Sequence, residues 1–358
     1  MVGMMNRAIK RRRFLEYSGA AGLAVLIPGA MPGVPLAGQR RRDAPDRSIM
    51  TTDAQGAIRR GLGFLEARQN EEGSFGTSGY ARNAAVCSLA GLAMLASGST
   101  PRRGAHGETV DRLLQFVLAQ ASDSGFIAVL DKATQGPMYD HGFATLFLAQ
   151  VYGMSSRREI RSVLKKAVQL IIDTQNSEGG WRYQPEQKDA DLSVTICQVT
   201  ALRAARDAGV FVPVETIDRS IAYVKRAQNT DGGFMYTLEG GESAFPRTAA
   251  GVVSLYNAGI HEGQEVESGL AYLEKNAPPP GGFDQSPHFL YGQYYATQAW
   301  WYAGGERWKQ WYLSLRDPLV AAQAADGSWT DRIGLEYATA LCCLILQMPN
   351  NYLPIFQR

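Results

Sequence analysis

Two kinds of hydrophobic segment alternate along the chain from residue 52 to its end. The first kind, such as VLKKAVQLIIDTQ at residues 163–175, places apolar residues three and four positions apart with charged residues between them. This spacing predicts a helix with one exposed face. The second kind, such as AAVCSLAGLAMLASG at residues 84–98, is apolar on nearly every side, so its helix must be buried. Six such pairs predict an inner ring of helices inside an outer ring.

A short phrase that ends in an aromatic residue recurs between the two helices of a pair. Its copies are QNEEGSF at 69, QASDSGF at 120, QNSEGGW at 175, QNTDGGF at 228 and QAADGSW at 323, and KNAPPPGGF at 275 stands where a sixth is expected. A period of about 50 residues predicts a repeat architecture. We expect the Gly to form a tight turn with positive φ and the aromatic ring to fill the seam between repeats. The Gln amide is expected to bond backbone groups at a helix end.

This phrase resembles the QW-type repeat of the squalene cyclase and protein prenyltransferase beta-subunit superfamily. The resemblance extends from residue 52 to the end of the chain. It implies an all-α fold, the α/α toroid (α6/α6 barrel) of about six helical hairpins, for residues 52–358. In this interpretation the phrase is structural, and function depends on the residues that face the central cavity.

The first 38 residues resemble a twin-arginine export signal. Arginines at 11–13 precede Phe-Leu, an apolar run follows over residues 19–27, and small residues end the segment. The run is too short to span a bilayer, which takes about 20 apolar residues, and Pro28 ends it. We expect residues 1–38 to direct export to the periplasm or cell exterior, residues 39–51 to form a basic linker, and no stable transmembrane anchor to remain after cleavage. An uncleaved anchor is the alternative.

Charge and cysteine content exclude several classes of function. The chain has a formal net charge of +2, and without its basic leader the rest is mildly acidic, so a nucleic-acid partner is not expected. The four cysteines lie in apolar helical runs without zinc-like spacing, which favours small buried side chains over metal ligands. We therefore expect no metal and no cofactor. The sequence does not indicate an oligomeric state.

Polar residues near the starts of the apolar inner helices are the candidates for a site. Aligning these helices on Leu202 and Leu255 and counting back seven residues gives the equivalent positions Ala85, His141, Thr195, Thr248, Gln293 and Tyr337, of which five are polar. A ring of polar groups at the entrance of an apolar pocket is the usual form of a ligand site. Helix capping is the alternative role for the two threonines.

The segment MYDHG (138–142) gathers a phenol, a carboxylate and one of the four histidines. Asp140 and His141 are therefore the predicted catalytic pair. The predicted ligand-binding residues are Tyr139, Asp191, Thr195, Arg247, Thr248, Tyr291, Gln293, Tyr294, Glu336 and Tyr337.

The motifs of the superfamily's known activities are incomplete in this chain. Class II terpene cyclases protonate an alkene or epoxide with the middle Asp of an Asp-x-Asp-Asp motif, whereas DADLSVT (189–195) has Leu192 in place of the last Asp. Protein prenyltransferases bind zinc through an Asp-x-Cys pair and a distant His. No cysteine of this chain has an Asp two residues before it. These departures argue against both activities in their usual form.

Two hypotheses follow. The first is an exported binding protein whose central cavity holds a hydrophobic ligand, isoprenoid- or lipid-like, or a glycan. The second is a divergent terpene-cyclase-like or lyase-type enzyme, in which Asp140 and His141 act as acid and base and Arg247 binds an anionic group. The incomplete motifs favour the first. The aromatic residues expected to line the cavity are Tyr139, Phe245, Tyr291, Tyr294, Tyr295, Trp300 and Trp301.

Overall fold

The prediction of paired helices is confirmed over the residues that the structure, a computed structural model, describes: 47–129, 136–279, 281 and 288–357. These residues form twelve α-helices and isolated β-bridges but no sheet. None of their helices is long and apolar enough to cross a bilayer. The predicted export signal and most of the predicted linker lie outside the described residues and stay predictions.

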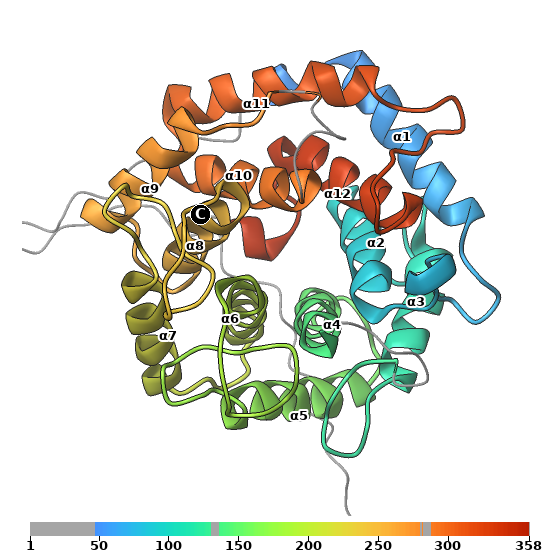
Figure 1. Cartoon of the computed structure of the whole chain (residues 1–358). Helices are drawn as coiled ribbons and strands as arrows, with labels where there is room; N and C mark the ends of the chain where they lie inside the picture. Colours follow the sequence, from blue (N-terminus) through green and yellow to red (C-terminus); the bar gives the residue numbers. More distant parts are fainter. Residues whose placement is uncertain (1–46, 130–135, 280, 282–287, 358) are drawn as a thin grey trace, which may run out of the picture. The chain divides into compact units, whose positions relative to one another are not determined.

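Odd-numbered helices form an outer ring around the even-numbered ones within the unit of residues 44–358 (Figure 1). The outer helices are α1 (Thr52–Ala67), α3 (Gly107–Ala119), α5 (Glu159–Asp173), α7 (Val214–Arg226), α9 (Gln264–Lys275) and α11 (Gly305–Ala321). The inner helices are α2 (Ala84–Ala96), α4 (Pro137–Val151), α6 (Leu192–Asp207), α8 (Phe245–Asn257), α10 (Phe289–Ala303) and α12 (Leu335–Gln347). Each inner helix packs on the next, and α12 packs on α2, which closes the inner ring. The predicted all-α toroid of six hairpins is confirmed.

The phrase turns back against the next outer helix at a glycine. Gly179 has a φ of 99°, and a Cβ atom there would lie 2.1 Å from the carbonyl oxygen of Arg219 in α7. Gly327 lies against α1 in the same way, where a Cβ atom would be 2.6 Å from the carbonyl oxygen of Arg60. Neither the dihedral angle nor the gap accepts a side chain, so glycine is required at this seam. Because α1 belongs to the first repeat, the last seam joins the two ends of the ring.

The glutamine amide fixes the same seam with two hydrogen bonds. Gln175 Nε2 donates to the carbonyl of Gly179 and to that of Thr216 in α7, both at 2.9 Å. Gln323 Nε2 bonds the carbonyl of Ala57 in α1 in the same manner, also at 2.9 Å. The acceptors therefore lie in the turn and in the next outer helix, where Thr216 belongs to the first turn of α7. One amide thus ties each of these hairpins to its neighbour.

The second copy of the phrase is shifted by one residue, because its glycine comes one position later than in the other copies. Gln120 Nε2 bonds the carbonyl of Phe116 in its own helix at 3.3 Å. Ala121 pairs with Ile127 in the bridge where the fourth copy pairs its Gln with its Phe. Gln120 therefore bonds a carbonyl in the last turn of its own helix, as expected, but it does not tie its hairpin to the next one. Ile127, not Phe126, takes the bridge position that Phe234 holds in the fourth copy. Most of the expected sixth copy lies outside the described residues.

The C-terminal segment covers the end of the inner ring at which the inner helices finish. It contains two short 3-10 helices, η3 (Met348–Asn350) and η4 (Pro354–Phe356), and η4 packs on α6. Ile355 donates its backbone N–H to Gln150 Oε1 at 3.2 Å, and Trp301 Nε1 donates to the carbonyl of Phe356 at 2.6 Å. The opposite end, where the inner helices begin, therefore holds the candidate site.

Gly179→Ala tests the seam against a matched glycine. Gly209 also has a positive φ, of 85°, but no atom lies within 4 Å of a Cβ atom built there. Gly209→Ala should lower the free energy of unfolding by about 1–2 kcal/mol through the dihedral angle alone. Gly179→Ala should lower it by a further ~1–3 kcal/mol, because the Arg219 carbonyl must move. Chemical denaturation measures both changes, and equal losses would contradict the close approach.

Candidate functional site

The first turns of five inner helices share one structural task. In each, a side chain accepts the backbone N–H of the residue that ends the preceding phrase, which orients the phrase on the helix. The acceptors are Cys87 Sγ for Phe75, His141 Nδ1 for Ile127, Thr195 Oγ1 for Trp181, Thr248 Oγ1 for Phe234 and Thr339 Oγ1 for Trp329, all at 3.1 Å.

These contacts correct the predicted alignment of the inner helices. Cys87 and Thr339 hold the places that were assigned to Ala85 and Tyr337, which stand two residues earlier. Gln293 keeps its place in α10, but the segment before that helix lies outside the described residues. Thr195 and Thr248 are fully buried and bond the backbone. Neither threonine caps its helix as the predicted alternative had it, because Asp191 caps α6 and α8 has no side-chain cap. Both have a structural role in holding the phrase, and the geometry does not favour ligand binding.

His141 belongs to the wall of the protein. Its Nδ1 accepts the N–H of Ile127, its Nε2 donates to the carbonyl of Ala167 at 3.1 Å, and its side chain is fully buried. Burial lowers the pKa of His141 to about 4, so the imidazole is neutral at pH 7. With both nitrogens occupied by the backbone, His141 has none left for a ligand. This geometry argues against an Asp140–His141 acid/base pair.

Six residues two positions before the shared acceptor place form what we call the mouth ring. Residues four positions apart lie on one face of a helix. Each mouth-ring residue therefore lies above the residue four positions later, which faces the central axis of the inner ring of helices. The mouth ring consists of Ala85, Tyr139, Ser193, Pro246, Tyr291 and Tyr337, and all six are partly exposed. The layer below it consists of Leu89, Phe143, Cys197, Ala250, Tyr295 and Leu341, and all six are buried. Of these two layers of side chains, only the mouth ring is accessible to a ligand.

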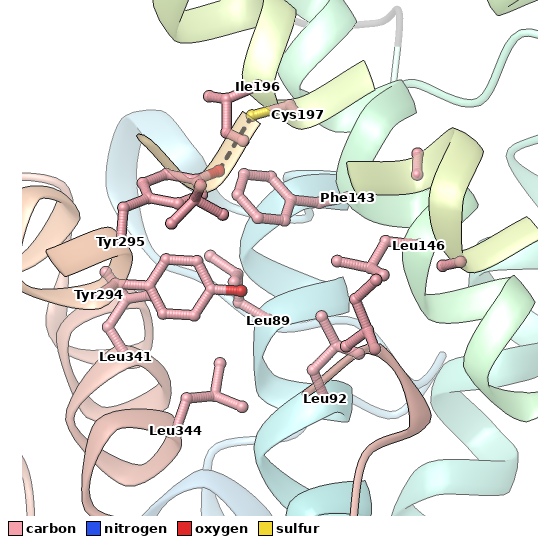
Figure 2. Packing of buried hydrophobic residues seen from close by; sticks show 14 of the residues in the cluster. Leu89, Leu92, Phe143, Leu146, Ile196, Cys197, Tyr294, Tyr295, Leu341 and Leu344 are labelled. Carbon is pink, nitrogen blue, oxygen red and sulfur yellow. Dashed lines mark hydrogen bonds between the residues drawn. The ribbon is translucent and has the colours of Figure 1, made fainter. Parts of the chain in front are cut away.

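Below the mouth ring, side chains fill the space that was expected to be an aromatic cavity. Figure 2 shows residues of α2, α4, α10 and α12 converging on the axis, among them Leu92, Phe143 and Tyr294. Tyr294 packs edge-on against Tyr295, with ring centroids 4.9 Å apart. The inner part of the toroid is thus an apolar core of buried residues.

Three of the expected lining residues face away from this axis. Phe245 and Trp300 pack against Trp311 of the outer helix α11, with ring centroids 6.1 Å and 5.9 Å away. Trp301 bonds the C-terminal segment. The prediction that Phe245, Trp300 and Trp301 line a central cavity is therefore wrong. A nearly all-apolar helix has apolar residues on both its inner and outer faces, and the sequence pattern does not distinguish the two.

Hydrogen bonds connect the mouth ring to the buried carboxyl group of Asp191. The hydroxyl of Tyr139 lies 2.5 Å from Ser193 Oγ, which donates to Asp191 Oδ1 at 2.6 Å. The hydroxyl of Tyr291 donates to the carbonyl of Ser193 at 3.3 Å. Asp191 also caps α6, because Oδ1 accepts the N–H of Val194 at 2.9 Å. One carboxylate thus serves the helix start and the mouth ring together.

The second oxygen of Asp191 has no hydrogen bond. Asp191 Oδ2 is buried, and the nearest charged partner is Arg182 Nε at 3.6 Å. Burial raises the pKa of Asp191, while the bonds to Ser193 and Val194 and the Arg182 charge oppose that rise. Sequence reasoning missed Ser193 and Arg182, although Ser193 follows the Asp-x-Asp stretch by two residues.

Asp140 lies beside the mouth ring at Ala85, whereas Asp191 lies beside it at Ser193. Its Oδ1 accepts from Asn83 Nδ2 at 2.7 Å and from the N–H of Ala85 at 3.3 Å, which joins α4 to the start of α2. Its Oδ2 is buried without a hydrogen bond. Burial raises the pKa of Asp140 to about 7. Two carboxyl groups, each with one unbonded oxygen, therefore flank the mouth ring.

Of the other predicted residues, two are engaged within the protein, while Gln293 is buried with its Oε1 lacking a hydrogen bond among the described residues. Glu336 pairs with Arg68 at 3.1 Å at the end of α1. Arg247 donates to the carbonyl oxygens of Glu242 at 2.6 Å and Phe234 at 3.4 Å, so it does not reach into the ring. Gln293 and Tyr294 are buried. Of the predicted set, the mouth ring and its flanks retain Tyr139, Asp140, Asp191, Tyr291 and Tyr337.

Comparisons with known proteins agree with this architecture. The family model of the squalene-hopene cyclase C-terminal domain matches residues 147–296. A drimenyl diphosphate synthase from Streptomyces showdoensis is 26% identical over 196 residues, which is 54% of this chain and 34% of that protein. The chain thus spans about a third of the length of this curated relative. These matches confirm the resemblance to the terpenoid cyclase-like superfamily.

Solved structures with the same fold include enzymes of two kinds. The type II terpene cyclase MstE from Scytonema superposes with a TM-score of 0.60 at 15% identity, over 84% of this chain and 99% of that one. An Asp-to-Asn variant of the same enzyme was solved with its substrate, geranylgeranyl dihydroxybenzoate. A GH76 α-mannanase from Bacteroides thetaiotaomicron gives a TM-score of 0.57 at 11% identity, over 86% and 98% of the two chains. At these identities the likeness shows the fold alone.

Asp140→Asn tests the buried carboxyl group. Because the folded-state pKa of Asp140, about 7, lies above its ordinary value, its neutral form favours folding at low pH, and this contribution is lost as pH rises to 7. The free energy of unfolding of the unmodified protein minus that of the variant should fall by about 1 kcal/mol or more between pH 4 and 7, and then level off. The His141 contribution, which is lost as pH falls below about 6.5, cancels in this difference. Urea denaturation across pH measures it, and a flat difference would contradict the raised pKa.

Proposed function

We propose that this protein binds an isoprenoid- or lipid-like molecule at the mouth ring. The observation that carries the proposal is the contrast along the axis, where a partly exposed ring with three tyrosines lies above a fully packed apolar core. Tyrosine offers a large apolar face together with a hydroxyl, which suits contact with a chain of mixed character. The molecule therefore lies across the mouth ring rather than in a deep central cavity.

The sequence comparisons favour a prenyl-type ligand over a glycan. The matched family model and the curated relative both concern terpenoid enzymes, and the model spans the chain from α4 to α10. The mannanase shares the fold but is supported by structure alone at 11% identity. A fold by itself does not determine a function. We therefore assign the prenyl-type ligand and treat glycan binding as the outcome that would oppose it.

A second candidate function is proton-initiated isomerisation of a prenyl chain by Asp191. Asp191 stands at the place of the middle Asp in the Asp-x-Asp-Asp motif, its pKa is raised by burial, and its Oδ2 has no hydrogen bond. A neutral carboxyl group gives its proton to an alkene, and a proton lost from the resulting cation restores the balance, so the product is an isomer. Leu192 removes the neighbouring carboxylate of the motif, and Arg182 stands beside Asp191 instead.

Ala85→Phe tests the location of the ligand. Three of the six mouth-ring positions already carry tyrosine, so an aromatic side chain suits this place in the helix. Filling the mouth should weaken binding of geranylgeraniol about tenfold or more, measured by quenching of intrinsic fluorescence. Phe211→Ser, at a residue that is 81% exposed in the α6–α7 loop, is the control and should bind as the unmodified protein does. Unchanged binding by a stably folded Ala85→Phe protein would place the ligand elsewhere.

Asp191→Asn separates binding from catalysis. Asn83 occupies the equivalent place in α2, and its Oδ1 caps that helix by accepting the N–H of Val86 at 3.0 Å. An asparagine at 191 should therefore keep the cap and leave the free energy of unfolding within about 1 kcal/mol. If Asp191 is a proton donor, conversion of geranylgeraniol or geranylgeranyl diphosphate to cyclic isomers should fall about 100-fold or more. Mass spectrometry of the products measures this loss. Absence of products from the unmodified protein would reject the catalytic candidate and leave binding.

A further inference from the structure

We propose that the molecule held at the mouth ring has an uncharged hydroxyl head group and is not a diphosphate. This inference rests on the proposed function and names its ligand class. The head group lies against the two carboxyl groups that flank the ring, Asp140 and Asp191. Each is at least 98% buried as a residue, and each has one oxygen without a hydrogen-bond partner among the described residues.

Both carboxyl groups are joined directly to mouth-ring residues. Asp140 Oδ1 accepts the N–H of Ala85 at 3.3 Å, and Asp191 Oδ1 accepts the hydroxyl of Ser193 at 2.6 Å. The hydroxyl of Tyr139 reaches Ser193 Oγ at 2.5 Å. Asp140 Oδ2 has no hydrogen-bond partner in the described part of the chain, and Asp191 Oδ2 has only the Arg182 charge at 3.6 Å. The other oxygen of each group is fixed, so the positions of both Oδ2 atoms are determined before a ligand arrives. A buried polar atom without a partner is costly, and a ligand that satisfies it gains that free energy on binding.

A hydroxyl group suits these oxygens in either protonation state. It donates to a carboxylate oxygen and accepts from a protonated one, because it is donor and acceptor at once. A diphosphate has acceptor oxygens and several negative charges, so beside two buried carboxyl groups it meets repulsion wherever either is ionised. Repulsion between like charges in a buried site is larger than in water.

The cations near the mouth ring are already engaged. Arg182 lies 3.2 Å from Asp189 and 3.6 Å from Asp191, and its guanidinium stacks over the rings of Tyr183 and Tyr236 at 5.2 Å and 5.6 Å. Tight diphosphate binding usually takes bidentate arginines or a lysine turned toward the phosphates. Arg182 uses its charge on the two aspartates instead.

Arg68 and Arg247 are committed in a similar way. Arg68 pairs with Glu336 at 3.1 Å, while Arg247 donates to backbone carbonyls. Arg332 is exposed and contacts the imidazole of His288, with Nη2 2.9 Å from Nδ1. Among the described residues, the head group therefore meets carboxyl and hydroxyl groups and one guanidinium, Arg182, whose charge is shared by Asp189 and Asp191. This arrangement favours an alcohol.

The test compares two probes that share one chain, geranylgeraniol and geranylgeranyl diphosphate, on the full-length protein at pH 7.5. The alcohol should bind at least about tenfold more tightly, equivalent to about 1.4 kcal/mol. Asp140→Asn/Asp191→Asn should strengthen diphosphate binding and so reduce the preference for the alcohol by about threefold or more, because the charges that repel the diphosphate are removed. Asp123→Asn/Asp173→Asn removes the same formal charge at exposed positions and should leave the preference unchanged.

Equal or tighter binding of the diphosphate by the unmodified protein would overturn this inference while the proposed function stands. A preference for the alcohol that the buried double variant leaves intact would also overturn it, because the carboxyl groups would not be its cause. Failure of both probes to bind, with a normal thermal unfolding transition, would overturn the proposed function and this inference with it.

Discussion

The close approach of a glycine turn to the next outer helix is the constraint on which the rest of the structure depends. At Gly179 the gap to the Arg219 carbonyl leaves no room for a Cβ atom, and the Gln175 amide bonds the same helix beside it. The contact recurs at Gly73, Gly125, Gly232 and Gly327 but not at Gly281, and its last copy lies on α1. It therefore fixes the spacing of five of the hairpin junctions and the closure of the ring. Stability in such an architecture comes from interfaces between neighbouring repeats.

The seam also determines which polar groups are left for a ligand. The phrase needs an acceptor for its last backbone N–H, and the first turn of the inner helix supplies it through Thr195, Thr248 or His141. In the sequence these side chains look available for ligand binding, but in the structure their acceptor atoms are occupied by backbone N–H groups. The residues two positions earlier, which form the mouth ring, do not accept this N–H and remain partly exposed. Asp191 is shared, because it caps α6 with one oxygen and keeps the other unbonded.

The sequence was sufficient for the helices and their ring, because the alternation of half-apolar and fully apolar segments reports burial directly. It was not sufficient for the register of single side chains. His141 and the threonines share a polar character with ligand-binding groups, and only the contact with the phrase distinguishes them. The directions of Phe245 and Trp300 are set by Trp311, a residue of another helix that no local pattern connects to them. Tyr139 and Asp191 were found because a carboxylate or phenol at a helix start is a local signal.

The measurement that tests the central claim most directly is a crystal structure of the protein with geranylgeraniol bound. The account predicts the alcohol across the mouth ring, with its oxygen within hydrogen-bond distance of Asp140 Oδ2 or Asp191 Oδ2 and its chain against Tyr139, Tyr291 or Tyr337. The apolar core below should keep its packing. A ligand found outside the inner ring, such as in the hollow of about 230 Å³ beside Trp300 and Trp311, would contradict the account.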